Sequence, residues 1–246
     1  MPLSRVESVQ TPDGPFDLTV WLPEGGTGPG LLLIQEIYGV SDYIRAVAKD
    51  LAALGYVVAA PDLFWRLQRN YQAEHTDEGL TESLALASRF DAGLGIADAA
   101  AALEHLRVLP EVDGRVGIIG FCSGGSIAYF LAGQSELDAV LSFYGSEVPG
   151  NLGVLERITS PLQLHFGGND PYIPRDQVAA VERASAGLPH VEVHVEEDAG
   201  HAFHNRKAPM FYTPEPAARA WRHAEEFLRP APARPGEGAA GVLAQP

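Results

Sequence analysis

The sequence is poor in cysteine and has no long apolar segment. Cys122 is its single cysteine, so no internal disulfide can form. No apolar run approaches the roughly 20 residues needed to span a bilayer, and the first residues lack the apolar core of a signal peptide. We therefore expect a cytoplasmic protein without membrane association. There a lone thiol stays reduced and is either a small buried hydrophobe or a reactive group.

Positive charge is scarce as well. The chain has 17 Lys and Arg residues against 32 Asp and Glu residues, a formal net charge of -15. Nucleic acids and anionic membranes attract clustered basic residues. We therefore expect neither as a partner. Solubility explains the acidity, which says nothing direct about a substrate.

The apolar residues, 46% of the chain, occur in short runs bounded by Gly, Pro or Asp, as expected for buried strands. The predicted strands are Val6–Gln10, Phe16–Leu22, Leu31–Gln35, Val57–Ala60, Val116–Gly120, Val140–Tyr144, Leu162–Phe166 and Val191–Val195. Apolar residues at helical spacing predict helices at Tyr43–Leu54, Ala92–Leu106, Ser126–Ala132, Pro174–Ala186 and Glu215–Leu228. This alternation predicts an α/β fold with a mainly parallel sheet and helices on both faces.

The ends of the chain depart from this alternation. The turn sequence Thr11–Pro15 joins the first two strands, which predicts a hairpin and an antiparallel N-terminal edge. We expect one domain over residues 1–229 and a disordered tail over 230–246, where Pro, Gly and Ala cannot build a core. The polar stretch Trp65–Leu84 is a candidate lid or pocket wall.

The sharpest motif is Gly120-Phe121-Cys122-Ser123-Gly124-Gly125, which lies between a predicted strand and a predicted helix. It is a nucleophile-elbow pattern with Cys at the position of the usual Ser. Gly120 and Gly124 remove side chains that would collide in so tight a turn. The helix N-terminus favours a thiolate, and the Ser123 N–H is placed to bind an oxyanion. The alternative is a buried structural cysteine on a Gly-rich turn; phosphate-binding and dinucleotide loops fit the spacing less well.

Two further residues follow later strands. Asp170 comes after the strand at Leu162–Phe166, and His201 follows the strand at Val191–Val195. Nucleophile, acid and base then stand in the chain order of α/β-hydrolases, at strand ends that share one edge of the sheet. Alternatively, Asp170 is a plain turn residue. His201 and His204 suggest a metal pair, but no third ligand has suitable spacing, so we expect no metal.

With these motifs, and with Gln35-Glu36-Ile37-Tyr38-Gly39 and Pro61-Asp62-Leu63, the chain resembles the dienelactone hydrolase family (carboxymethylenebutenolidases). The resemblance implies an α/β-hydrolase fold, a Cys-His-Asp triad, no cofactor and a monomer rather than a dimer. It also implies that Glu36 contacts the thiol until substrate displaces it, and that the Ile37 N–H completes the oxyanion hole with Ser123. A carboxylate beside the thiol raises its pKa and protects it from oxidation.

The substrate pocket departs from the family pattern. Leu80 and Leu84 stand where the family places an Arg and a Tyr that hold a substrate carboxylate, and Asn205 stands where a third arginine is expected, with Arg206 one residue late. A buried carboxylate without such partners binds poorly. We therefore expect a smaller or more apolar ester or lactone than dienelactone as substrate. The candidate pocket residues are Gln35, Tyr38, Leu80, Leu84, Tyr144, Phe203 and Arg206.

The sequence thus predicts a hydrolase of small esters or lactones that acts through a Cys122 thioester, with His201 as base, Asp170 as orienting acid and Glu36 beside the thiol. Arg66 and Arg69 are possible anion contacts, with solvated surface residues as the alternative. Two other functions stay open. One is an acyltransferase or general carboxylesterase on the same fold, and the other is a non-catalytic ligand or thiol sensor.

Overall fold

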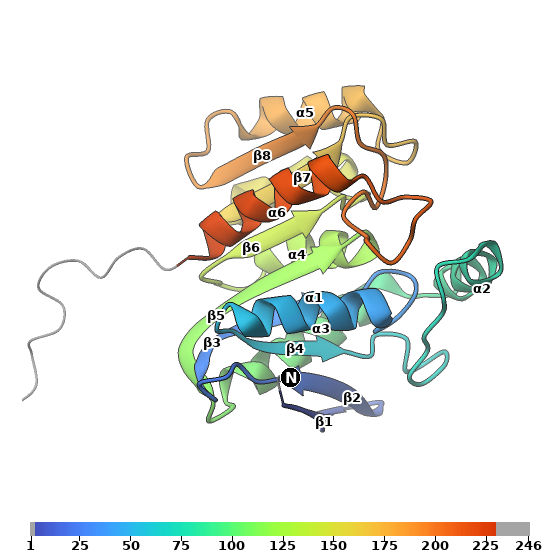
Figure 1. The fold of residues 1–246 in the computed structure, drawn as a ribbon. Helices are drawn as coiled ribbons and strands as arrows, with labels where there is room; N and C mark the ends of the chain where they lie inside the picture. Colours follow the sequence, from blue (N-terminus) through green and yellow to red (C-terminus); the bar gives the residue numbers. More distant parts are fainter. Residues whose placement is uncertain (1–2, 230–246) are drawn as a thin grey trace, which may run out of the picture.

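The computed structural model describes residues 3–229 and contains a sheet of eight strands in the order β1-β2-β4-β3-β5-β6-β7-β8 (Figure 1). The predicted tail, residues 230–246, lies outside the described residues. All eight predicted strands are confirmed, with bounds shifted by a few residues. They are β1 (Ser4–Thr11), β2 (Gly14–Trp21), β3 (Gly28–Ile34), β4 (Val57–Pro61), β5 (Val112–Phe121), β6 (Val140–Phe143), β7 (Leu162–Gly167) and β8 (Val191–Glu196).

The sheet is mainly parallel with an antiparallel N-terminal edge, as predicted. β1 and β2 form a hairpin in which Thr11 pairs with Gly14, and β2 pairs antiparallel to β4. Every other neighbouring pair, from β4 and β3 through to β7 and β8, is parallel. The carboxyl ends of β3 to β8 therefore lie at the same edge of the sheet, where loops can bring together residues distant in sequence.

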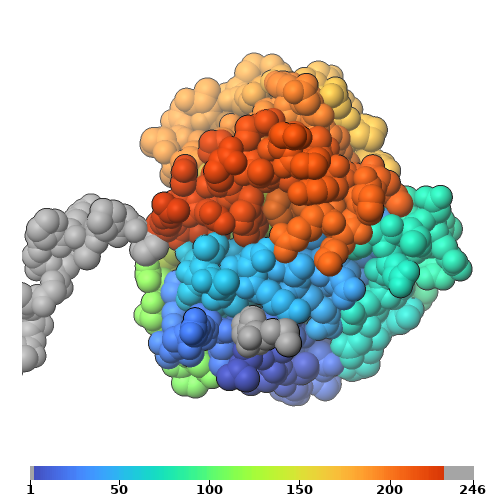
Figure 2. Space-filling view, viewed as in Figure 1, coloured from blue at the N-terminus to red at the C-terminus, as the bar shows by residue number. Residues whose placement is uncertain are grey.

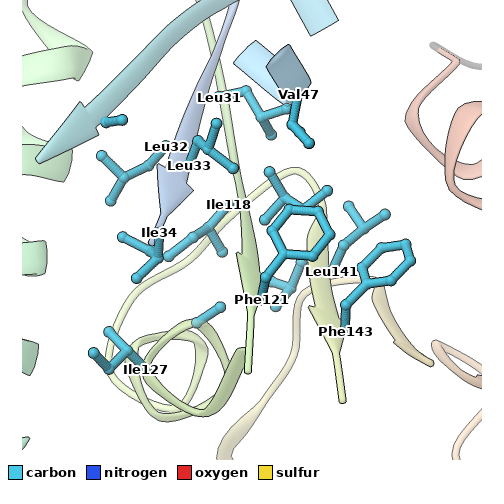
Figure 3. Packing of buried hydrophobic residues seen from close by; sticks show 14 of the residues in the cluster. Leu31, Leu32, Leu33, Ile34, Val47, Ile118, Phe121, Ile127, Leu141 and Phe143 are labelled. Carbon is cyan, nitrogen blue, oxygen red and sulfur yellow. The ribbon is translucent and has the colours of Figure 1, made fainter. Parts of the chain in front are cut away.

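Helices cover both faces of the sheet, because its central strands are apolar on both sides. In Figure 1, α1 and α6 lie on the near face, while α3, α4 and α5 lie behind. Figure 3 shows the packing between layers, where Leu33 and Ile118 of adjacent strands and Val47 of α1 are fully buried. The five predicted helices are α1 (Asp42–Ala53), α3 (Ala92–Arg107), α4 (Ser123–Ala132), α5 (Arg175–Ser185) and α6 (Pro214–Leu228).

Two helical segments were not predicted from the sequence: α2 (Asp77–Ala87) and the 3-10 helix η1 (Pro149–Arg157). α2 overlaps the end of the candidate lid, Trp65–Leu84, and buries only Gly79, Ser83 and Leu86, so its apolar pattern is weak. The Thr76 hydroxyl accepts a hydrogen bond from the Gly79 N–H at 3.1 Å and fixes the start of α2. The helix projects beyond the carboxyl edge of the sheet (Figure 1). In Figure 2 the same segment forms the teal surface at the right of the molecule.

Within residues 3–229, no helix combines the length and the apolar character needed to cross a bilayer.

Candidate active site

Cys122 stands at the turn between β5 and α4, in a backbone conformation that few non-glycine residues adopt, with φ 55° and ψ -118°. The flanking glycines are required by space. A Cβ on Gly120 would lie 2.0 Å from the Gly124 carbonyl oxygen, and one on Gly124 would lie 2.4 Å from the Gln35 carbonyl oxygen. These approaches allow the sharp strand-to-helix turn that presents the cysteine at the edge of the sheet.

The thiol, the imidazole and the carboxylate lie in one hydrogen-bonded line. His201 Nε2 is 3.1 Å from Cys122 Sγ, and His201 Nδ1 is 2.7 Å from Asp170 Oδ2. The other oxygen of Asp170 accepts hydrogen bonds from the backbone N–H groups of Tyr172 and Ile173 at 2.8 and 3.2 Å. With its side chain fully buried and both oxygens engaged, Asp170 holds one orientation of the imidazole ring.

The surroundings of His201 favour its protonated form. Burial of the imidazole lowers its pKa, but the charge of Cys122 and the hydrogen bond that the ring donates to Asp170 outweigh burial and raise the pKa to about 10. A base with such a raised pKa keeps its proton close to the sulfur at neutral pH. The geometry can therefore support a thiolate–imidazolium pair, which is the nucleophilic form of a cysteine.

Glu36 lies beside Cys122 in the cavity wall, but its carboxylate is engaged elsewhere. Glu36 Oε1 is 2.6 Å from His75 Nε2 and accepts a hydrogen bond from Asn205 Nδ2 at 3.0 Å. The expected contact between Glu36 and the thiol is not among the hydrogen bonds of residues 3–229, in which Cys122 Sγ pairs with His201. His75 was missed from the sequence because nothing local links it to Glu36.

The two amides expected to bind an oxyanion belong to Ile37, which lines the same cavity as Cys122, and to Ser123, which follows Cys122 in the chain. Ser123 is the first residue of α4, so its N–H has no acceptor within the helix. In the described part of the chain, no backbone hydrogen bond outside the regular elements uses the Ile37 N–H. Both N–H groups are therefore available to an oxygen atom bound next to Cys122.

A cavity of about 300 Å³ opens onto Cys122 and His201. Three residues predicted for the substrate pocket line it: Tyr38, Leu80 and Leu84. The other residues of the wall were not predicted from the sequence: Ser146, Tyr172, Ala202 and Phe211. Among the residues that line this cavity there is no Lys or Arg, so the wall that faces a substrate is largely apolar.

Four predicted pocket residues do not line this cavity. Tyr144 is fully buried; its hydroxyl lies 3.3 Å from the Tyr43 hydroxyl, and its ring packs against His201 and Phe203. Phe203 is likewise part of the core. The remaining two are fixed by other partners, because Gln35 accepts a hydrogen bond from the Leu63 N–H and Arg206 pairs with Asp50 at the surface.

The other predicted ligand contacts have different partners. Arg66 pairs with Asp13 and Asp98, and Arg69 donates to the Pro15 carbonyl, so neither reaches the cavity. His204 Nδ1 lies 2.7 Å from the Tyr43 hydroxyl, and burial lowers the pKa of this imidazole to about 3. Over residues 3–229, no group of three or more His, Cys, Asp or Glu side chains is arranged to hold a metal ion.

A mainly parallel sheet with a nucleophile elbow after β5, an acid after β7 and a histidine after β8 defines an α/β-hydrolase. The sequence pattern of the dienelactone hydrolase family matches residues 16–231, and the chain belongs to that family of hydrolases, as its motifs predicted. Carboxymethylenebutenolidase of Pseudomonas putida is 30% identical over 225 residues, which cover 91% of this chain and 95% of that protein.

Solved structures agree with this assignment. A dienelactone hydrolase-like promiscuous phosphotriesterase from metagenomic libraries is 25% identical, with a TM-score of 0.75 over 92% of this chain and 96% of that one. Dienelactone hydrolase from Anabaena variabilis ATCC 29413 is 22% identical and has a TM-score of 0.68 over 92% of this chain and 96% of that one. This second likeness is one of fold.

Proposed function

We propose that this protein hydrolyses small uncharged esters or lactones through a Cys122 thioester. The observation that carries the proposal is the hydrogen-bonded line from Cys122 Sγ to His201 Nε2 at 3.1 Å and from His201 Nδ1 to Asp170 at 2.7 Å. All three groups come from separate loops at one edge of the sheet, next to two unengaged amides. This is the set of groups that nucleophilic acyl transfer requires.

In the first half-reaction, the Cys122 thiolate attacks the carbonyl carbon and the carbonyl oxygen becomes an oxyanion. The Ile37 and Ser123 N–H groups stabilise this oxyanion, and one such donor is typically worth about 3 kcal/mol in transition-state energy. The bond from carbon to the leaving oxygen then breaks, and His201 gives its proton to that oxygen. The products are a thioester on Cys122 and a free alcohol, or the tethered hydroxyl of an opened lactone.

In the second half-reaction, His201 takes a proton from water, which attacks the thioester carbon. The carbon–sulfur bond breaks, the acid is released, and the thiolate is restored beside the imidazolium. Asp170 keeps the ring oriented in both halves because its second oxygen is fixed by backbone N–H groups. We infer an apolar acyl group from the cavity wall, in which Leu80, Leu84 and Phe211 offer no partner to a carboxylate.

The test is turnover of p-nitrophenyl butyrate by the wild type, Cys122→Ala and Cys122→Ser, with folding checked by circular dichroism. We expect multiple turnovers by the wild type, none by Cys122→Ala, and an acyl adduct on Cys122 in intact-protein mass spectra of quenched samples. Activity that survives in Cys122→Ala would remove the cysteine mechanism. A stoichiometric burst without turnover would indicate a thiol sensor, and ester products formed with added alcohol would indicate an acyltransferase.

A further inference from the structure

The carboxylate of Glu36 is buried and held by two side chains from distant parts of the sequence. The side chains of Glu36 and His75 are only 3% and 4% exposed, and Asn205 is fully buried. His75 Nε2 and Asn205 Nδ2 both reach the same oxygen, Oε1, at 2.6 and 3.0 Å. A buried carboxylate needs such donors, because an unpaired charge in the interior is costly.

The two holding residues are themselves fixed. Asn205 Oδ1 accepts a hydrogen bond from the Lys207 N–H at 3.0 Å, so the amide must present its NH2 group to Glu36. The His75 ring packs on Tyr38, with ring centroids 4.1 Å apart, just before α2 begins. Both contacts restrict the carboxylate to its present position, in which it bonds to His75 and Asn205 while the thiol pairs with His201.

We propose that His75 is a positioning residue that, with Asn205, holds Glu36 away from the nucleophile, so that Cys122 is already paired with His201 before substrate binds. This inference rests on the proposed role of Cys122 as the nucleophile. Without the His75 donor, Oε1 keeps only the hydrogen bond from Asn205, and the carboxylate can turn toward the thiol, because Glu36 and Cys122 line the same cavity. A carboxylate that accepts a hydrogen bond from the thiol favours the neutral thiol and slows its reactions.

The charged and titratable groups near His75 are few. Asp42, Glu74 and Lys207 line a surface depression with it, which is separate from the cavity at Cys122. The rings of Tyr38 and Tyr43 pack on it from the inside. A His75 variant keeps all of these groups. A change in thiol reactivity that depends on Glu36 therefore reports the contact between His75 and Glu36.

The experiment measures the rate of Cys122 alkylation by iodoacetamide against pH, by intact-protein mass spectrometry, together with kcat/KM on p-nitrophenyl butyrate. The variants are His75→Phe, His75→Gln, Glu36→Gln and the double variant His75→Phe with Glu36→Gln. The matched control is His190→Phe, since His190 bonds to the Ile158 carbonyl at the opposite edge of the sheet. Thermal melts establish that each variant folds.

We expect His75→Phe to slow alkylation at neutral pH by about tenfold and to move the pH profile up by about one unit, which corresponds to ~1.4 kcal/mol. His75→Gln keeps a donor and should stay within about threefold of the wild type, as should the double variant, in which no carboxylate is left to approach the thiol. If His75 had a purely structural role, His75→Phe would lower stability equally with Glu36 and with Gln at position 36. The pH profile of alkylation would then be unchanged.

Three results would overturn the proposal: an unshifted profile for His75→Phe, a shift that persists when Glu36 is also replaced, or faster alkylation of the single variant Glu36→Gln. The last result would mean that the carboxylate already acts on the thiol, and it can be measured even if His75→Phe fails to fold. Failure of the proposed function would look different, since the wild type would then lack turnover or Cys122→Ala would retain it.

Discussion

A cation placed on α2 should allow the cavity to accept a substrate that carries a carboxylate. Leu80 lies in the cavity wall with Cys122, and no Lys or Arg lines that wall. Its backbone N–H bonds to the Thr76 carbonyl in the first turn of α2, a hydrogen bond that Arg retains, and Arg is a good helix former. The substitution is therefore Leu80→Arg, which changes the charge of the cavity wall and leaves Cys122 in place.

The expected preference between two esters follows from the absence of a Lys or Arg partner for a carboxylate in the cavity wall. Mono-p-nitrophenyl succinate carries a carboxylate where p-nitrophenyl butyrate has a methyl group. Enclosing that carboxylate without a cation costs about 3 kcal/mol, so the wild type should prefer the butyrate ester by roughly 150-fold in kcat/KM. A guanidinium in hydrogen-bond reach recovers about 2 kcal/mol, which should narrow the preference by roughly 30-fold in Leu80→Arg.

The assay is release of p-nitrophenol from both esters by the wild type, Leu80→Arg and two controls. Leu80→Gln changes size and polarity without charge, and Leu94→Arg adds the same charge on α3, at an exposed position outside the cavity. Neither control should narrow the preference by more than about twofold. Equal cleavage of both esters by the wild type, or an equal narrowing of the preference by Leu94→Arg, would refute the inference that a wall without Lys or Arg selects the acyl group.

Asp170→Asn should lower kcat on p-nitrophenyl butyrate by about 1000-fold or more, because an amide does not hold the His201 ring with Nδ1–H inward; a loss below tenfold would contradict its orienting role. Cys122→Ser should lower the pKa of His201 from about 10, because the charge of the sulfur, which offsets the effect of burial, is then removed. NMR titration of the ring should show deprotonation well below that pH, and an unchanged titration would disprove this balance. Gly124→Ala should cost more than about 3 kcal/mol in urea unfolding, since the added Cβ meets a backbone oxygen at 2.4 Å, whereas Gly187→Ala meets nothing within 4 Å and should cost little.

Local patterns were sufficient for the strands and for the residue types at the edge of the sheet. Most central strands are short apolar runs, and Cys122, Asp170 and His201 each follow a predicted strand. α2 was not predicted, because it buries few residues and its pattern resembles that of a loop. The order of the strands in the sheet could not be predicted from the sequence, because it differs from their order in the chain: β4 lies between β2 and β3.

The sequence by itself determined the fold class and selected Cys122, Asp170 and His201 as candidate catalytic residues, because backbone sterics and apolar periodicity act over a few neighbouring residues. The tertiary structure decided which predicted residues line the cavity and which side chains contact one another. It assigned Tyr144 to the core and brought His75 and Asn205 to Glu36 across 39 and 169 residues of chain. Such partners depend on packing between distant segments, which leaves no periodic trace in the sequence.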